Sequence, residues 1–316
     1  VVDSQDLTLN ISRETLQQNN QLHAIARKVE KKVTSELKKM LKSDRAAYEK
    51  FFEDFGRGLE YGIYTSYGML KDELADLLLF YSAKEQKMVT LAEYLEAMPA
   101  DQKSIYYAAG DSIDRLAKLP IVNTVLGKGY DVLLCTKDVD EFCFQSMMTY
   151  GPEAEKDAEG KDIEGTGPKE LKNVASGDLD FASEEEKKEA EEAEKDNEAL
   201  LSAMKEQLGD AVTKVAVSTR LTDAPSAVTT EGPVSLEMER LMSQMPDGMG
   251  EVKSQRVLEL NAKHPVFQVL KDAQSAGDAE KVKLYTEILY DQALIVEGMP
   301  IADPVAYANA VTKLMA

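Results

Sequence analysis

Apolar residues recur three or four positions apart through most of the first hundred residues. Between residues 16 and 40 charged residues fill the gaps, which is the pattern of an amphipathic helix. Residues 48–55 predict a second helix that stops near Gly56, and residues 61–79 predict a third. Residues 90–93 are spaced as a capping box, which predicts the start of a fourth. We therefore expect this part of the chain to be a helical segment.

Shorter apolar runs, typical of strands, replace the helical pattern between residues 101 and 150. Residues 104–109 predict one strand, and residues 130–135 predict a second, buried strand. Each is followed by a stretch with helical spacing, at 111–116 and 139–148, and Asp111 is placed to cap the first of these helices. The order strand, helix, strand, helix predicts a small α/β unit with parallel pairing.

The pattern weakens again over residues 151–182, where glycine and charged residues dominate. This composition predicts a variable junction with at most one strand, near residues 171–174. A second capping box at 183–186 predicts the charged helix that opens the rest of the chain. The elements expected after it are strands at 211–217 and 227–230, a methionine-rich helix at 236–245, a strand at 256–260, and helices from Pro265, Asp278 and Pro304.

Together these elements predict a helix-rich α/β (α+β) fold of two consecutive mixed α/β domains. The first, residues 1–182, holds the helical segment 1–100, the α/β unit 101–150 and the junction 151–182. The second is residues 183–316. The length of 316 residues and the hydrophobic content of 43 % are sufficient for a core in each.

Charge and cysteine content narrow the classes of function. The formal net charge of −20 argues against binding a nucleic-acid backbone or an anionic membrane surface. No run approaches the roughly 18 apolar residues of a membrane span, and no signal peptide is recognisable. Two cysteines, Cys135 and Cys143, are too few for a disulfide framework, which predicts a cytoplasmic protein. Neither they nor His23 and His264 form a metal-binding pattern, so no metal is expected.

Arg13 is the first candidate for chemistry. It follows Ser12, which is placed to cap a helix, and Gln17 lies one turn later on the same face. A guanidinium beside free helix N–H groups suits a phosphate. An arginine in a first helical turn is most often solvated, so the local pattern leaves both interpretations open.

A series of motifs spanning nearly the whole chain resembles the ninety-kilodalton heat-shock chaperone family, in its middle and C-terminal domains. The stretch from about 151 to 200 is the least similar. In chain order the motifs are Val2-Asp3-Ser4, Leu9-Asn10-Ile11-Ser12-Arg13-Glu14, Leu16-Gln17-Gln18-Asn19, Tyr48-Glu49-Lys50-Phe51, Phe55-Gly56, Lys103-Ser104-Ile105-Tyr106-Tyr107, Gly129-Tyr130-Asp131-Val132-Leu133, Asp140-Glu141-Phe142, Arg220-Leu221-Thr222-Asp223-Ala224-Pro225, Leu258-Glu259-Leu260-Asn261, His264-Pro265 and Tyr290-Asp291-Gln292-Ala293-Leu294.

The resemblance implies that Arg13 contacts the γ-phosphate of ATP held by a separate N-terminal domain, with Gln17 as its polar partner. The chain shows neither a P-loop nor the Asp-x-Gly-x-Gly motif of the family's ATPase domain. We therefore expect ATP and Mg²⁺ to be bound only in a longer protein, by an N-terminal domain that this chain lacks. The chain alone is expected to bind no cofactor and to hydrolyse no ATP.

The methionine-rich helix is the second candidate, through Met238, Leu241, Met242 and Met245. Methionine is flexible and frequent at surfaces that bind varied partners, although an ordinary core face has the same spacing. The resemblance implies an exposed helix that contacts non-native client proteins. It places Phe142 and Gln145 in a second client patch, where the family often has tryptophan instead of Phe142.

Two amphipathic helices at the end of the chain are the third candidate. They either pack on their own domain or pair with a second copy, and the resemblance implies a dimerisation bundle of four helices. The residues assigned to it are Tyr285, Ile288, Leu289, Gln292, Ile295, Tyr307, Val311 and Leu314.

The resemblance therefore predicts a homodimeric chaperone whose partners are non-native client proteins and other cytosolic chaperones. The chain lacks the acidic Met-Glu-Glu-Val-Asp tail of eukaryotic relatives, which indicates the bacterial branch. A non-catalytic dimerisation scaffold is the alternative. A self-contained enzyme is disfavoured, because no nucleophile, base and orienting residue group together in the sequence.

Overall fold

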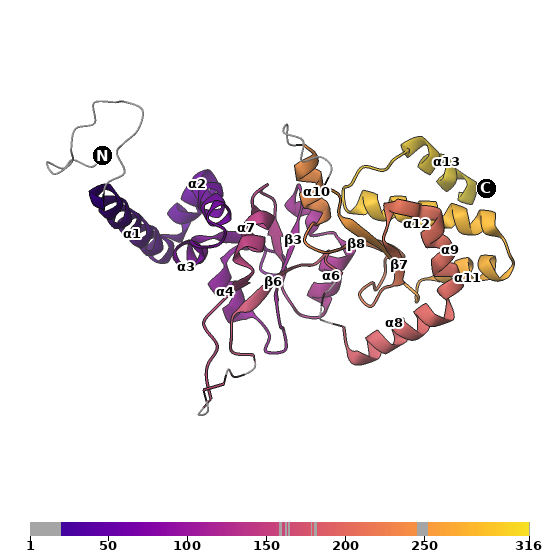
Figure 1. The fold of residues 1–316 in the computed structure, drawn as a ribbon, viewed down its shortest axis with the longest axis horizontal. Helices are drawn as coiled ribbons and strands as arrows, with labels where there is room; N and C mark the ends of the chain where they lie inside the picture. Colours follow the sequence, from indigo (N-terminus) through magenta and orange to yellow (C-terminus); the bar gives the residue numbers. More distant parts are fainter. Residues whose placement is uncertain are drawn as a thin grey trace.

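The computed structural model describes residues 20–157, 160–161, 163, 165–177, 179, 182–244 and 252–315. These ranges hold thirteen α-helices and two β-sheets, which confirms the predicted helix-rich α/β class. Figure 1 shows the elements spread along one long axis. N-terminal helices lie at one end, a six-stranded sheet (the large sheet) in the middle, and a three-stranded sheet (the small sheet) with the last helices at the other end.

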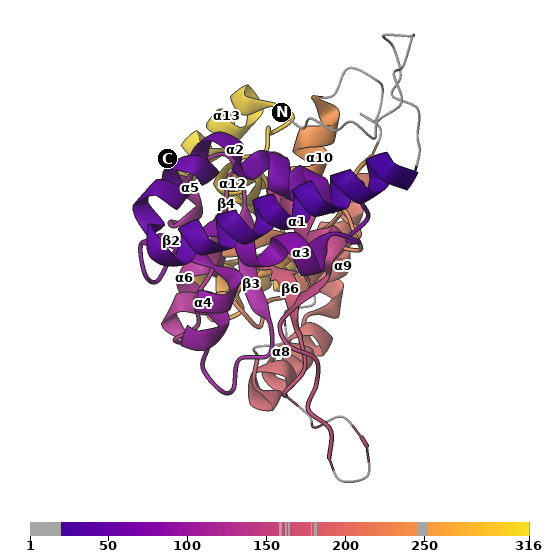
Figure 2. The same cartoon turned by 90° about the vertical axis from the view of Figure 1, so that its left-hand side faces the viewer.

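Two long helices, α1 (Asn20–Ser43) and α2 (Arg45–Thr65), form the N-terminal end, and Figure 2 shows α1 running across it. Asp44 separates them and caps α2 by accepting a hydrogen bond from the backbone N–H of Ala47 at 3.1 Å. The predicted stop at Gly56 is wrong, because α2 continues through it. A Cβ at position 56 would lie 2.7 Å from the Phe52 ring, so the glycine makes room for packing.

The continuous helix predicted over residues 61–79 is wrong, because α2 ends at Thr65 and only the short helix at Lys71–Leu74 and a 3₁₀ turn at Ala75–Leu77 follow before the chain becomes a strand. The chain instead enters a hairpin of β1 (Leu79–Ser82) and β2 (Lys87–Thr90), which the sequence pattern did not indicate. The side chains of residues 77–80 are all buried, at most 2 % exposed. A run buried on both faces shows no polar alternation, so its period does not distinguish a strand from a helix.

The predicted α/β unit lies at the centre of the large sheet, whose strand order is β2-β1-β4-β3-β6-β5. Strand β3 pairs in parallel with both β4 and β6, which confirms the predicted parallel pairing. Alternate residues of β3 face two cores: Tyr107 points toward the core beside α2 and α7, and Tyr106 toward the core beside α6. The bounds are α3 (Lys71–Leu74), a 3₁₀ turn (Ala75–Leu77), α4 (Leu91–Ala97), β3 (Ile105–Ala109), α5 (Ile113–Leu116), α6 (Pro120–Gly127), β4 (Leu133–Cys135), α7 (Asp140–Met147), β5 (Thr149–Tyr150) and β6 (Lys169–Asn173).

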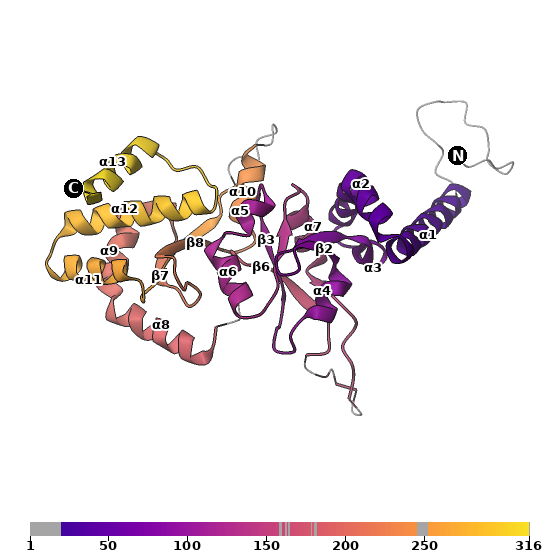
Figure 3. The ribbon, with the colours of Figure 1, turned by 180° about the vertical axis from the view of Figure 1, so that it is seen from behind.

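The small sheet has the order β7-β9-β8, with β9 parallel to β7 and antiparallel to β8. Helices pack on the small sheet to form a third core. Figure 3 shows α11 and α12 at the same end of the molecule as the last helix. The bounds are α8 (Glu184–Asp196), α9 (Glu198–Leu208), a 3₁₀ turn (Gly209–Ala211), β7 (Lys214–Val217), β8 (Ser226–Glu231), α10 (Leu236–Ser243), β9 (Gln255–Leu260), α11 (Pro265–Ser275), α12 (Ala279–Val296) and α13 (Pro304–Met315).

Three of the local capping signals in the sequence are confirmed and one is wrong. The capping boxes at Thr90 and Ser183 both form with both of their hydrogen bonds, and Asp278 caps α12 as predicted. The start predicted at Asp111 is wrong, because α5 begins two residues later. The Asp111 carboxylate is instead 3.0 Å from the guanidinium of Arg115 in an ion pair, which removes it from the helix terminus.

Cys135 and Cys143 are both buried and free, and burial raises the pKa of each thiol above its ordinary value. Across the described ranges, no three His, Cys, Asp or Glu residues are placed to hold a metal ion. In the same ranges, no helix has the length and apolar content to span a membrane.

Candidate functional site

Two of the predicted client segments, α7 and α10, meet in the structure. The side-chain amide of Gln145 on α7 donates a hydrogen bond to the carbonyl oxygen of Pro233 at 2.7 Å. The same Nε2 atom lies 2.8 Å from the sulfur of Met238 on α10. Helix α7 packs beside the large sheet, and α10 lies between strands β8 and β9 of the small sheet, so this contact lies where the two sheets adjoin (Figure 1).

A buried carboxylate one turn earlier on α7 anchors the start of α10. Glu141 accepts hydrogen bonds from the hydroxyl of Ser235 at 2.5 Å and from the amide of Asn173 at 2.6 Å. The Ser235 oxygen also accepts a hydrogen bond from the backbone N–H of Met238 and so caps α10. Burial raises the pKa of Glu141, and the hydrogen bonds from Ser235 and Asn173 oppose that rise. Sequence reasoning did not identify Glu141 or Ser235 as site residues, because their contact joins positions 94 residues apart.

The methionine-rich helix divides into a buried turn and an accessible turn. Leu236 and Met238 are buried, each 4 % exposed, whereas Leu241 and Met242 are half-buried. The first turn of α10 therefore belongs to the core, and the second offers apolar side chains at the surface. Met245 lies outside the described residues, as do Arg13 and Gln17, so the structure does not place these three.

Exposed apolar residues extend from α7 onto α2 and the turn after it. We call Tyr61, Tyr64, Tyr67, Met69 and Met148 the aromatic surface. Phe142, which was predicted to contact clients, is buried beneath this surface. Its ring lies 5.4 Å from the Tyr64 ring, centroid to centroid, and the Tyr64 ring lies 6.0 Å from that of Tyr61. An exposed apolar group of this kind marks an interaction surface more often than a single exposed residue does.

Two exposed members of the aromatic surface have an unusual backbone conformation. Tyr67 is 88 % exposed and has a φ of 52°, and Met148 is 70 % exposed and has a φ of 61°. The turn after α2 lies against the end of α7, since a Cβ at Gly68 would overlap the carbonyl oxygen of Ser146. Residues other than glycine rarely adopt a positive φ, and such strain gathers at functional sites.

The predicted dimerisation residues fall into two groups. Ile288 and Leu289 are buried within the chain's own core, and the hydroxyl of Ser226 on β8 donates to the backbone carbonyl of Leu289 at 2.9 Å. Tyr285, Tyr307 and Val311 are half-buried, and Gln292, Ile295 and Leu314 are exposed. Beside them, α13 exposes Val305 and Met315. One face of α12 thus covers the small sheet, while the dimer itself stays a prediction.

A buried charged cluster beside α7 is unsuited to bind a substrate. The ammonium of Lys137 lies 2.7 Å from Glu60 and 3.6 Å from Asp140, and both carboxylates are at most 2 % exposed. Burial, with the neighbouring charge of Asp140, raises the pKa of Glu60 to about 9. The cluster therefore lies beneath the surface, with the Lys137 ammonium between two buried carboxyl groups.

Comparisons with known proteins identify the family. The model of the family described as "Hsp90 protein" matches residues 1–316. Among curated proteins, the chain is 50 % identical over 315 residues to "Chaperone protein HtpG" of Clostridium perfringens. It is 48 % identical to the protein of the same name in Oceanobacillus iheyensis and 46 % to that in Bacillus subtilis. Each match covers 100 % of the chain and 47 % of the relative, so the chain spans about half the length of these proteins. The chain therefore belongs to the Hsp90 protein family.

Proposed function

We propose that the chain is the client-holding part of an ATP-driven molecular chaperone, and that α7, α10 and the aromatic surface hold the client. The observation that carries the proposal is the contact of Gln145 with Pro233 and Met238. It places the exposed Gln145 of α7 against the start of α10, whose second turn presents Leu241 and Met242 at the surface. The family relationship supports the same activity, because the similar proteins are named chaperones.

The chemistry of this region suits a client without a fixed sequence. Leu241 and Met242 present flexible apolar side chains, and methionine adapts to irregular partners because three of its bonds rotate. Tyr64 and Tyr67 add large apolar rings, each with a hydroxyl group that keeps the surface compatible with water. An unfolded segment with exposed apolar residues gains burial on such a surface.

The remaining roles come from the family and from the sequence. Arg13 and Gln17 contact the γ-phosphate of ATP, which with Mg²⁺ is bound by a domain outside this chain. The exposed residues of α12 and α13, among them Ile295 and Leu314, pair with a second copy. The protein works in the cytoplasm with non-native clients and other chaperones. These exposed residues equally support the alternative, a dimerisation scaffold that holds no client.

Substitution of Met242 by aspartate separates the two functions. We expect Met242→Asp to fold and to lose much of its ability to suppress the aggregation of heat-denatured citrate synthase, because it places a charge in the apolar turn of α10. Light scattering of the client at 43 °C and circular dichroism of the chain itself are the two measurements.

Met238→Asp is the matched variant, because it makes the same change one turn earlier, at a buried position. We expect it to lower the melting temperature of the chain, since it buries an unpaired charge. Undiminished suppression by a folded Met242→Asp variant would contradict the client-holding role of α10 and favour the scaffold.

A further inference from the structure

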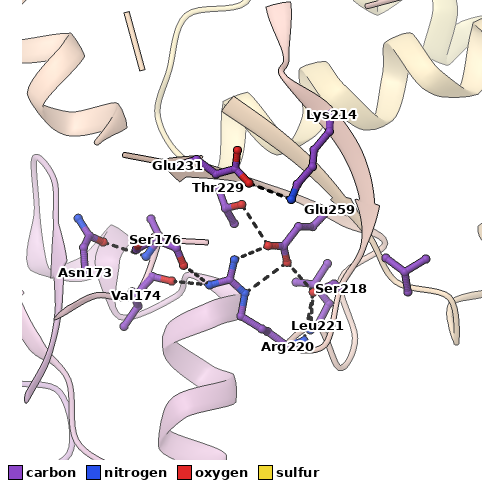
Figure 4. A network of polar contacts seen from close by, with 12 residues as sticks. Asn173, Val174, Ser176, Lys214, Ser218, Arg220, Leu221, Thr229, Glu231 and Glu259 are labelled. Atoms are coloured by element: carbon purple, nitrogen blue, oxygen red, sulfur yellow. Dashed lines mark hydrogen bonds and ion pairs between the residues drawn. The ribbon is translucent and has the colours of Figure 1, made fainter. Parts of the chain in front are cut away.

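Arg220, in the loop after β7, is a buried cation that reaches from the small sheet to the backbone of the large sheet. Its side chain is 4 % exposed. Figure 4 shows the guanidinium between Glu259 of the small sheet and the segment that leaves β6. On one side Nε and Nη2 donate to the two carboxylate oxygens of Glu259. On the other side Nη1 donates to the carbonyl oxygens of Val174 and Ser176.

The Glu259 carboxylate is fixed by both neighbouring strands. Glu259 lies on the central strand β9, and it accepts hydrogen bonds from the hydroxyl of Ser218 after β7 at 2.7 Å and from that of Thr229 on β8 at 3.1 Å. Burial alone would raise the pKa of Glu259, but the charge and hydrogen bonds of Arg220, together with the hydroxyls of Ser218 and Thr229, lower the pKa below its ordinary value. The carboxylate is therefore a rigid, charged base for the guanidinium.

The segment that Arg220 holds is shared by the two sheets. The N–H of Val174 donates to the carbonyl of Tyr107 on β3 at 2.8 Å, which ties the segment to the large sheet. The next residues of the segment form backbone hydrogen bonds with β8, at the edge of the small sheet. The N–H of Thr230 donates to Ala175 at 3.1 Å, and the N–H of Gly177 donates to Thr230 at 2.9 Å. The carbonyl oxygens of Val174 and Ser176 face Arg220, while the carbonyl oxygen of Ala175 between them accepts from Thr230.

This joint lies close in sequence to the start of α10. Thr230 is near the end of β8, and Pro233 and Ser235 lie shortly after it in the sequence. These two residues contact Gln145 and Glu141 on α7. The position of Thr230 against residues 174–177 therefore sets where the start of α10 meets α7.

We propose that Arg220 is a positioning residue that fixes the small sheet against the large sheet and thereby holds α10 in register with α7. Other contacts, among them the hydrogen bond of Ser235 to Glu141, also cross the joint. The pair of Lys128 and Glu186, at 3.2 Å, is partly exposed, and such pairs contribute little. The buried guanidinium of Arg220 makes two hydrogen bonds to Glu259 and two to backbone carbonyls. Because the Glu259 carboxylate is itself held in place, this planar group has little freedom to move. The inference rests on the proposed function only where it refers to client holding.

Two variants test the role without leaving a buried charge unpaired. Arg220→Lys keeps the cation but has no planar fork to bond the carboxylate and both carbonyls together. Arg220→Met combined with Glu259→Met removes both charges and keeps side chains of similar length, so apolar atoms still occupy the space between the small sheet and the segment after β6. Lys214→Met with Glu231→Met is the matched control, because this exposed pair joins β7 and β8 in the same sheet at 2.8 Å and does not reach the large sheet.

The measurement is the distribution of distances between two spin labels, obtained by pulsed electron paramagnetic resonance. The labels are attached to cysteines introduced by Glu96→Cys on α4 and Ser275→Cys on α11. Both positions are exposed, and the two native cysteines are buried, so the labels attach to the introduced thiols. Dilution with unlabelled protein removes distances between copies. We expect a broadened and shifted distribution in both Arg220 variants and no change in the control pair.

A distribution with unchanged mean and width in both Arg220 variants, in protein that is still folded, would overturn the positioning role. A residue that contributed only to stability would leave the distribution of the folded protein unaltered. Suppression of citrate synthase aggregation by the same variants then tests the proposed function separately. If the joint loosens and client holding is unaffected, the positioning role stands and α7 with α10 is not the client site.

Discussion

Replacing Arg220 with methionine alone is expected to lower the free energy of unfolding by about 3–5 kcal/mol, because it leaves the Glu259 carboxylate buried and uncompensated. Glu259 is 8 % exposed, and its remaining partners are the hydroxyls of Ser218 and Thr229. Two neutral donors do not replace the charge of a guanidinium. Urea unfolding followed by circular dichroism measures the difference, with the small sheet expected to unfold first.

The matched comparisons identify the cause of this loss. The double variant Arg220→Met with Glu259→Met is expected to recover most of the stability, since no charge is left without a partner. Lys214→Met, in the exposed pair of the same sheet, is expected to cost no more than about 1 kcal/mol. A loss from Arg220→Met no larger than that from Lys214→Met would contradict the buried-pair account.

Arg13→Ala is expected to abolish the stimulation of ATP hydrolysis that the chain gives to a separately purified nucleotide-binding domain of the same family. Arginines that meet the charge on a transferred phosphoryl group accelerate other enzymes by about 10³–10⁵. The chain by itself is expected to release no phosphate, and phosphate release by the mixture measures the effect.

Arg27 supplies the control for that experiment, because it is an exposed arginine on α1 of the same chain. Arg27→Ala is expected to leave the stimulation unchanged, which separates a specific contact from a general loss of positive charge. Full stimulation by Arg13→Ala would remove the arginine from the phosphate contact. Phosphate release by the chain alone would contradict the expectation that the nucleotide is bound elsewhere.

Much of the fold was predictable where the signal is local. The capping boxes at Thr90 and Ser183 depend on residues three positions apart, and both form as predicted. Gly56 misled the prediction because its role is contact with Phe52 inside a continuous helix. The strand β1 was missed because residues 77–80 are buried on every side, which removes the alternation that identifies a strand.

The site was less predictable than the fold. Resemblance suggested Gln145 and Met238 as separate client residues, and the structure brings them into contact. Nothing in the spacing of the sequence pairs Glu141 with Ser235, or Arg220 with Val174, because these contacts depend on how the two sheets adjoin. Arg220 and Glu259 each lie in a family motif, yet only three-dimensional proximity shows that they form one ion pair.

Site-specific photocrosslinking tests the central claim most directly, because it shows where an unfolded protein touches the chain. The probe p-benzoylphenylalanine replaces Tyr67 or Met242 in the proposed client region, and Gln268, exposed on α11, in the control. The client is reduced and carboxymethylated α-lactalbumin, which cannot refold. The account predicts crosslinks from positions 67 and 242 and few or none from position 268. Equal crosslinking at all three positions, or crosslinking confined to position 268, would contradict it.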